Sequence, residues 1–186
     1  MKTKHGAMEM SMGTIVTIVL LMSVLVLGLV LVNTIFKSAK GAIDLTDQQL
    51  RSEISKIFSE ESEIAIYPGT KLVEIKQEST DGVGVGIKNL LQGQAGTKTF
   101  SYEAVVSDPD LGRKCGGVSE ETVTNWISTG RSEQNIPLAS GDFSSQKILL
   151  EIPVGAPLCT IRFRVNVNTE DGAYATDFFD IKIKAK

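Results

Sequence analysis

One long stretch without a charge limits what this chain can fold into. It runs from Ile15 to Phe36 in a sequence of 186 residues. At a rise of about 1.5 Å per residue, a helix of this length is roughly 33 Å long and matches a hydrocarbon core of about 30 Å. Because backbone polar groups in lipid have to be satisfied within the segment, we predict one transmembrane helix over residues 14–36.

The apolar helix has two possible fates, removal as a secretory signal or retention as an anchor. A secretory signal has an apolar core of about 7 to 15 residues, followed by a cleavage site of small residues. The run here is longer, and the segment after it offers only Ala39 or Ala42 as a weak site. We therefore predict an uncleaved, single-pass anchor that sits in the lipid bilayer.

The sequence on either side of the anchor divides into three further parts. These are a short N-terminal tail over 1–13, an amphipathic helical stalk over 37–61, and a β-sandwich domain over 62–186. A capping box at Thr46 and Gln49 begins the helix of the stalk. Apolar side chains then recur at helical spacing, at Leu50, Ile54, Ile57 and Phe58. That apolar face has to pack on the chain's own domain or on neighbouring copies.

From Tyr67 onward the apolar period is 2, which indicates strands. In the segment 158–168 the alternate apolar residues are Cys159, Ile161, Phe163, Val165 and Val167. The turn TEDG and a second alternating run follow, so we predict an antiparallel hairpin. Four other alternating runs, TKLVEIKQE, GVGVGIKNL, KTFSYEAVV and QKILLEIPV, complete a mainly β chain. The fold class predicted is an antiparallel β-sandwich similar to immunoglobulin-like surface domains. Ser119 is predicted to cap a short helix that Trp126 pins to the core.

The residues of the domain offer little of the chemistry that catalytic and metal centres use. The single histidine, His5, precedes the apolar run, which removes Ser-His-Asp, Cys-His and His-containing zinc sites from the domain. The net charge is −3, and acidic and basic residues are mixed along the chain, so there is no basic patch of the kind that binds nucleic acid. We therefore expect a protein that is not an enzyme, with no catalytic residue, no metal, no cofactor, no nucleic acid and no small-molecule substrate.

Three local motifs have competing interpretations. Cys115, in a Gly-rich loop, and Cys159, on a strand, would form a disulfide in an oxidising compartment; the alternative is two unrelated cysteines. DGVGVGIKN looks like a phosphate loop, but its alternating Val and Ile residues favour a strand with a bulge or close strand packing. The acidic turn that contains Asp108 and Asp110 is expected to be ordinary turn chemistry rather than a calcium site.

The membrane orientation follows from two opposed signals. Lys2, Lys4 and the amino group precede the helix, whereas four cations follow it, and this Lys/Arg count slightly favours a cytoplasmic C-terminus. The four are Lys37, Lys40, Arg51 and Lys56. The short tail, the β-sandwich and the cysteine pair favour the reverse. We predict a protein of the cell membrane with a cytoplasmic N-terminus and an extracellular C-terminal domain.

The N-terminal sequence KHGAMEMSMGTIVTIVLLMSVLVLGLVLV resembles archaeal type IV pilin-like proteins. Its GAMEMS segment is also similar to the leader of uncharacterised archaeal single-pass membrane proteins. The pilin resemblance implies cleavage of a short leader near Gly6 and Ala7, a pilin-like head, and apolar helices stacked in a filament. The cut would make Glu9 the third residue of the mature chain, where pilins carry the acid at the fifth. Glu9 would then either face water or contact a neighbouring subunit.

Two functions remain open from the sequence. The first is a non-catalytic, membrane-anchored surface protein whose sandwich serves binding or cell-envelope structure, with identical subunits or other envelope proteins as partners. The second is a pilin-like filament subunit that assembles through its N-terminal helix.

Overall fold

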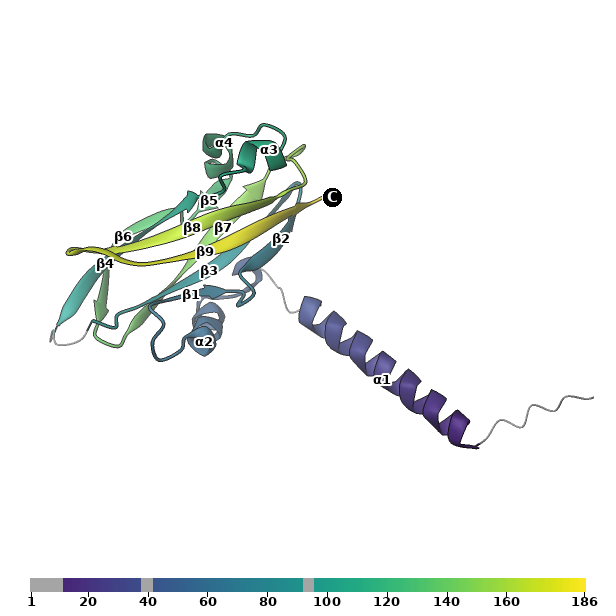
Figure 1. Ribbon diagram of the computed structural model, residues 1–186. Helices are drawn as coiled ribbons and strands as arrows, with labels where there is room; N and C mark the ends of the chain where they lie inside the picture. Colours follow the sequence, from purple (N-terminus) through teal and green to yellow (C-terminus); the bar gives the residue numbers. More distant parts are fainter. Residues whose placement is uncertain (1–11, 38–41, 92–95) are drawn as a thin grey trace, which may run out of the picture. The chain divides into compact units, whose positions relative to one another are not determined.

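The structure is a computed structural model that describes residues 12–37, 42–91 and 96–186. The chain divides into two compact units, Met1–Ala39 and Lys40–Lys186, and each is described by itself. Figure 1 labels the elements along the chain. The helices are α1 (Met12–Lys37), the 3-10 turn η1 (Ala42–Asp44), α2 (Asp47–Ile57), α3 (Leu111–Lys114) and α4 (Glu120–Thr124). The strands are β1 (Ile64–Tyr67), β2 (Leu72–Lys76), β3 (Ser79–Lys88), β4 (Thr97–Val106), β5 (Ile127–Thr129), β6 (Ser132–Ala139), β7 (Phe143–Ile152), β8 (Thr160–Thr169) and β9 (Gly172–Lys184).

The first unit contains helix α1, the predicted apolar helix. Its side chains are exposed all along the stretch Gly13–Leu31. Thr17 and Ser23 donate their hydroxyls to carbonyl oxygens one turn back, at 2.7 and 2.8 Å, so these polar groups are satisfied inside the helix. The helix is therefore long and apolar enough to be a membrane span or a signal sequence.

The second unit is a sandwich of two β-sheets. The four-stranded sheet has the order β1-β3-β7-β5, and the five-stranded sheet has the order β2-β9-β8-β4-β6. Strands β2 and β9 are parallel, whereas the other paired strands are antiparallel. The predicted fold class, mainly β with an N-terminal apolar helix, is confirmed, and the parallel pair makes the five-stranded sheet mixed.

The core lies between the two sheets and follows the alternation of the sequence. Strands β8 and β9 form the predicted hairpin, in which Phe163 pairs with Phe179. The two rings stack with their centroids 5.2 Å apart, and both side chains are fully buried. The inward positions of β8 are all apolar and its outward positions all polar, so the hairpin presents a polar outer face.

Some elements differ from the prediction. Strands β1, β5 and β6 were not expected, because β1 and β5 are short and β6 has exposed side chains at most positions. Ser119 caps helix α4 as predicted, but this helix ends at Thr124 and the chain enters β5 three residues later, at Ile127. Trp126 is buried at that junction, with 8% of its surface exposed.

Helix α2 packs on the chain's own domain, the first of the two alternatives left open by the sequence. The helix begins with the predicted capping box of Thr46 and Gln49. Its apolar side chains Leu50 and Ile54 are 1% and 0% exposed, and they pack on the outer face of the four-stranded sheet. The helix is therefore a layer of the sandwich unit rather than part of a stalk over 37–61.

The glycines of β3 make room for this helix. Val83, Val85 and Ile87 face the core, so the glycines between them face outward. A Cβ built on Gly84 would lie 2.3 Å from the Leu50 Cδ1, and one built on Gly86 would lie 2.3 Å from the Ile54 Cγ2. The strand predicted for this segment is confirmed. Its glycine spacing reflects close approach of a helix, in addition to the close strand packing expected.

The three tyrosines should make the free energy of unfolding depend on pH in the alkaline range. Burial, and then the charge of Glu133, raises the pKa of Tyr102 to about 12. Its hydroxyl donates to the carbonyl of Gly130 at 2.9 Å. Burial is also the largest cause that raises the pKa of Tyr67 and of Tyr174. Tyrosine in the unfolded chain ionises near pH 10, so the unfolded state gains stability first as the pH rises.

We therefore expect stability to be retained below pH 10 and to fall between about pH 10 and 12, by up to about 3 kcal/mol from Tyr102 alone. Tyrosinate absorbance and far-UV circular dichroism, recorded together, should change in one transition. A Tyr102→Phe variant should show a smaller loss over the same range. Ionisation of all three tyrosines near pH 10, with the circular dichroism unchanged, would contradict this expectation.

Candidate functional site

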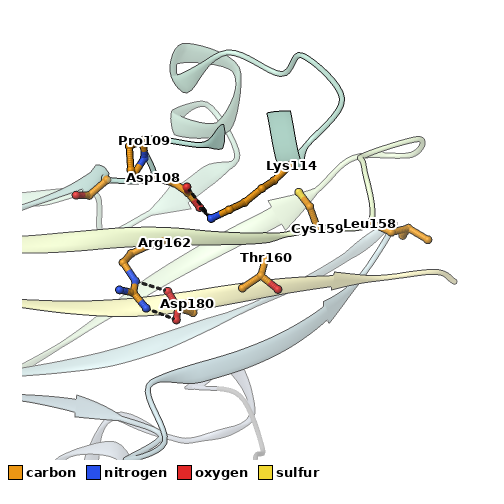
Figure 2. Close-up of a pocket in the computed structure, with 9 residues that line it drawn as sticks. Asp108, Pro109, Lys114, Leu158, Cys159, Thr160, Arg162 and Asp180 are labelled. Atoms are coloured by element: carbon orange, nitrogen blue, oxygen red, sulfur yellow. Dashed lines mark hydrogen bonds and ion pairs between the residues drawn. The ribbon is translucent and has the colours of Figure 1, made fainter. Parts of the chain in front are cut away.

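A hollow in the surface of the sandwich lies where β4 ends and β8 begins. It is open, with a volume of about 650 Å³ (Figure 2). The residues that line it are Ser107, Asp108, Pro109, Lys114, Leu158, Cys159, Thr160, Arg162 and Asp180. Two ion pairs and one exposed leucine therefore share a single cavity.

Asp108 forms the first ion pair, in the turn between β4 and α3. Its side chain is only 4% exposed, and its Oδ1 lies 3.1 Å from the Lys114 Nζ. The backbone N–H of Asp110 also donates to it, at 3.1 Å. Burial raises the pKa of Asp108, but the hydrogen bonds from Lys114 and Asp110 outweigh burial and hold it below its usual value. Asp108 is therefore an ionised, structurally held carboxylate at neutral pH.

Arg162 and Asp180 form the second ion pair, across β8 and β9. The two residues are register partners, and two nitrogens of the guanidinium donate to the two carboxylate oxygens, at 2.8 and 2.9 Å. Hydrogen bonding to Asp180 raises the pKa of Arg162. The guanidinium also lies 4.2 Å from the ring centroid of Phe178. Figure 2 shows this pair beside the Asp108–Lys114 pair.

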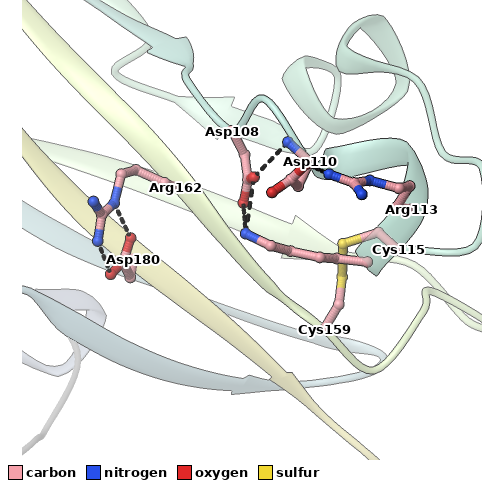
Figure 3. A network of polar contacts seen from close by, with 8 residues as sticks. Asp108, Asp110, Arg113, Cys115, Cys159, Arg162 and Asp180 are labelled. Atoms are coloured by element: carbon pink, nitrogen blue, oxygen red, sulfur yellow. Dashed lines mark hydrogen bonds and ion pairs between the residues drawn. A yellow bond between two sulfur atoms is a disulfide. The ribbon is translucent and has the colours of Figure 1, made fainter.

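The cysteine pair fixes one wall of the hollow. Cys115 follows α3 and is fully buried, whereas Cys159 precedes β8. Their sulfur atoms form a disulfide that joins positions 44 residues apart in the sequence (Figure 3). The disulfide predicted from Cys115 and Cys159 is therefore confirmed. It holds α3, and with it Lys114, against the start of β8.

The hollow opens onto the outer face of the five-stranded sheet. The outward side chains of β8, β9 and β2 there include five cations, Lys76, Arg162, Arg164, Lys182 and Lys184, and two carboxylates, Glu74 and Asp180. We call this set the basic face. Glu74 lies 3.0 Å from Lys182 and 3.2 Å from Lys184, and hydrogen bonds from Lys182 and then Lys184 lower its pKa.

Two apolar side chains belong to the same surface. Phe178 is 40% exposed and Leu72 is 37% exposed. Among the described residues, Arg164 and Lys76 of the basic face have no ion-pair partner. The surface therefore offers excess positive charge beside apolar area, a combination that suits recognition of an anionic surface.

The other site residues considered from the sequence are not gathered here. Gly6, Ala7 and Glu9 lie outside the described residues. Asp110 pairs with Arg113 instead of joining Asp108. Within residues 12–37, 42–91 and 96–186, no group of three His, Cys, Asp or Glu side chains could hold a metal ion. The Arg162–Asp180 pair was missed, although both residues occupy polar positions of the predicted hairpin.

Comparisons with known proteins give little beyond the fold. No protein-family model matches the sequence, and no curated protein matches it. A family 123 glycoside hydrolase from Clostridium perfringens matches 62% of this chain with 8% identity and a TM-score of 0.38, and the match covers only 23% of that enzyme's chain.

Two other solved structures show the same level of likeness. A Niemann-Pick type C2 protein from the Japanese carpenter ant has 16% identity and a TM-score of 0.39, over 66% of this chain and 90% of that one. A PapD-like domain of human CEP192 has 13% identity and a TM-score of 0.40, over 67% and 85%.

Proposed function

We propose that this protein is a single-pass, membrane-anchored surface protein whose sandwich serves binding or cell-envelope structure without catalysis. The observation that carries the proposal is helix α1, whose apolar side chains are exposed from Gly13 to Leu31. Leaving that much apolar surface in water is costly, whereas a bilayer satisfies it. The hydroxyls of Thr17 and Ser23, bonded within the helix, suit the same environment.

The disulfide supports a sandwich on the outer side of the membrane. Disulfides persist in oxidising compartments and are rare in the cytosol. The Cys115–Cys159 bond lies within the sandwich unit, so an outer location of that unit accounts for it. This location places the N-terminus in the cytoplasm.

The binding role rests on the character of the exposed surface. The basic face and the hollow present paired charges, and both carboxylates of the hollow are held by cations. A carboxylate with a lowered pKa, such as Asp108, is a poor proton donor or acceptor at neutral pH. Such groups suit recognition of a polar surface better than proton transfer.

Protease added to intact cells tests the topology. We expect an epitope tag placed after Lys186 to be accessible to antibody and removed by protease without lysis, because the domain lies outside. A cytoplasmic protein followed in the same cells should stay protected until lysis. Protection of the tag in intact cells, with digestion only after lysis, would reverse the orientation.

The sequence of the mature N-terminus separates this proposal from its alternative. A chain that keeps the residues before Ala7 favours the anchored surface protein. A chain that begins at Ala7, together with sheared filaments that contain the protein, favours the pilin-like subunit. A chain that begins after Phe36, or full-length protein in the aqueous fraction, would overturn both.

A further inference from the structure

A second charged surface lies on the opposite layer of the sandwich unit. Segment 42–64, which covers η1, α2 and the loop to β1, carries six carboxylates: Asp44, Asp47, Glu53, Glu60, Glu61 and Glu63. Its two cations are Arg51 and Lys56. We call this segment the acidic layer. It covers the four-stranded sheet, whereas the basic face belongs to the five-stranded sheet.

Much of the negative charge of the acidic layer is not neutralised locally. Lys56 pairs with Glu53 at 2.7 Å, and Lys147 of β7 pairs with Asp47 at 3.0 Å. Arg51 is directed away from the carboxylates, since it donates to the carbonyl of Phe143 and lies over its ring. Four carboxylates of the acidic layer form no ion pair with any described residue: Asp44, Glu60, Glu61 and Glu63.

The basic face has the complementary excess. Five cations stand there against two carboxylates, in a chain whose net charge is −3. Each carboxylate is already engaged, Asp180 by Arg162 and Glu74 by two lysines. The two surfaces therefore carry opposite excess charge, positive on the basic face and negative on the acidic layer.

We propose that the basic face binds the acidic layer of a second copy of this chain. The two surfaces lie on opposite layers, so a copy bound through its basic face keeps its acidic layer free. Such a contact is heterologous and does not close on itself, and repetition makes an open row of molecules. Phe178 and Leu72, exposed on the basic face, supply apolar area to the contact.

The inference rests on the proposed function, because a membrane anchor confines copies of the chain to one membrane surface. This confinement raises the effective concentration at which the copies meet. The two can fail separately. The topology experiment reports where the domain lies, whereas the experiments below report whether copies associate and through which surfaces.

Zero-length cross-linking of the full chain in non-ionic detergent tests the contact. A carbodiimide joins lysine amines to carboxylates that touch. An equal mixture of unlabelled and ¹⁵N-labelled protein identifies links between copies. We expect mixed-isotope links between lysines of the basic face, Lys76, Lys182 or Lys184, and carboxylates of the acidic layer. Links confined within single chains would overturn the inference.

Charge reversal separates this contact from association through α1. The Arg164→Glu/Lys184→Glu variant reverses the basic face, and the Glu60→Lys/Glu61→Lys variant weakens the acidic layer. We expect each to lower the association constant, measured by sedimentation, by about tenfold or more. The matched controls Arg113→Glu/Arg131→Glu and Glu120→Lys/Glu121→Lys lie outside both surfaces and should associate like the parent. Association that ignores all four changes, or that is the same at about 50 and 500 mM salt, would overturn the inference.

Mixing the two variants gives the sharpest result. The basic-face variant keeps its acidic layer, and the acidic-layer variant keeps its basic face, so each pair retains one intact contact. We expect an equal mixture to associate at concentrations at which neither variant associates alone. Failure of the mixture to associate would contradict a heterologous contact.

The competing occupant of the basic face is an anionic lipid surface. Amine labelling of Lys182 and Lys184 in nanodiscs of neutral and of anionic lipid distinguishes the two. Protection that depends on protein density in neutral lipid supports the contact between copies. Protection that appears only with anionic lipid would overturn it in favour of lipid binding.

Discussion

Reduction of the Cys115–Cys159 disulfide is expected to lower the free energy of unfolding by about 4 kcal/mol. The bond joins positions 44 residues apart, and the loop it closes contains α4 and three strands, β5, β6 and β7. Opening this loop returns conformational freedom to the unfolded chain, which is the main origin of the loss in the chain-entropy model. Denaturant unfolding of the oxidised and reduced protein measures it.

A double Cys115→Ala/Cys159→Ala variant is the matched control for this measurement. It should unfold like the reduced protein and should not respond to reductant. The local effect should appear at the hollow, because the bond holds α3 against β8 and so positions Lys114 beside Asp108. Equal denaturation midpoints for the oxidised and reduced protein would show that the bond does not stabilise the fold.

A Gly86→Val substitution is expected to displace helix α2 and to cost about 3 kcal/mol. A Cβ at Gly86 would lie 2.3 Å from the Ile54 Cγ2 and 2.8 Å from the ring of Phe58. Both partners are held by their own packing, so either the helix or the strand has to move. Hydrogen exchange at the amides of α2, together with denaturant unfolding, measures the displacement.

Two companion variants make this second result specific. Gly112→Val places the same side chain where nothing lies within 4 Å of the new Cβ, and it should cost far less. Ile54→Ala removes the obstructing methyl groups, so its combination with Gly86→Val should be less destabilising than the sum of the single changes. Fully additive effects would show that the glycine has no part in seating the helix.

The sequence predicted those parts of the fold that depend on residues close together in the chain. The alternation in β8 and β9 specifies which side chains face the core, and a tight turn joins them, so the hairpin followed from the sequence. The capping box of α2 depends on residues three positions apart and was also predicted. The charge-free run of α1 was predicted from its own residues, without knowledge of any contact that it makes.

Long-range pairing was beyond the same reasoning. The parallel alignment of β2 with β9 joins residues more than a hundred positions apart, and no turn connects them. The Arg162–Asp180 pair depends on the strand register, which alternation restricts but does not determine. The outward glycines of β3 indicated a close approach, but the sequence did not identify α2 as the neighbour that approaches.

The position of α2 in the chain determines how the sandwich bears load. The polypeptide leaves the domain through α2 and η1, before β1, so tension applied from α1 reaches the contacts of Ala42, Leu50 and Ile54 on the four-stranded sheet before it reaches the strands. Those contacts are apolar and lie outside the strand pairing of the sheets. A pull on the tether would therefore peel the helix away and lengthen the linker while both sheets keep their hydrogen bonds.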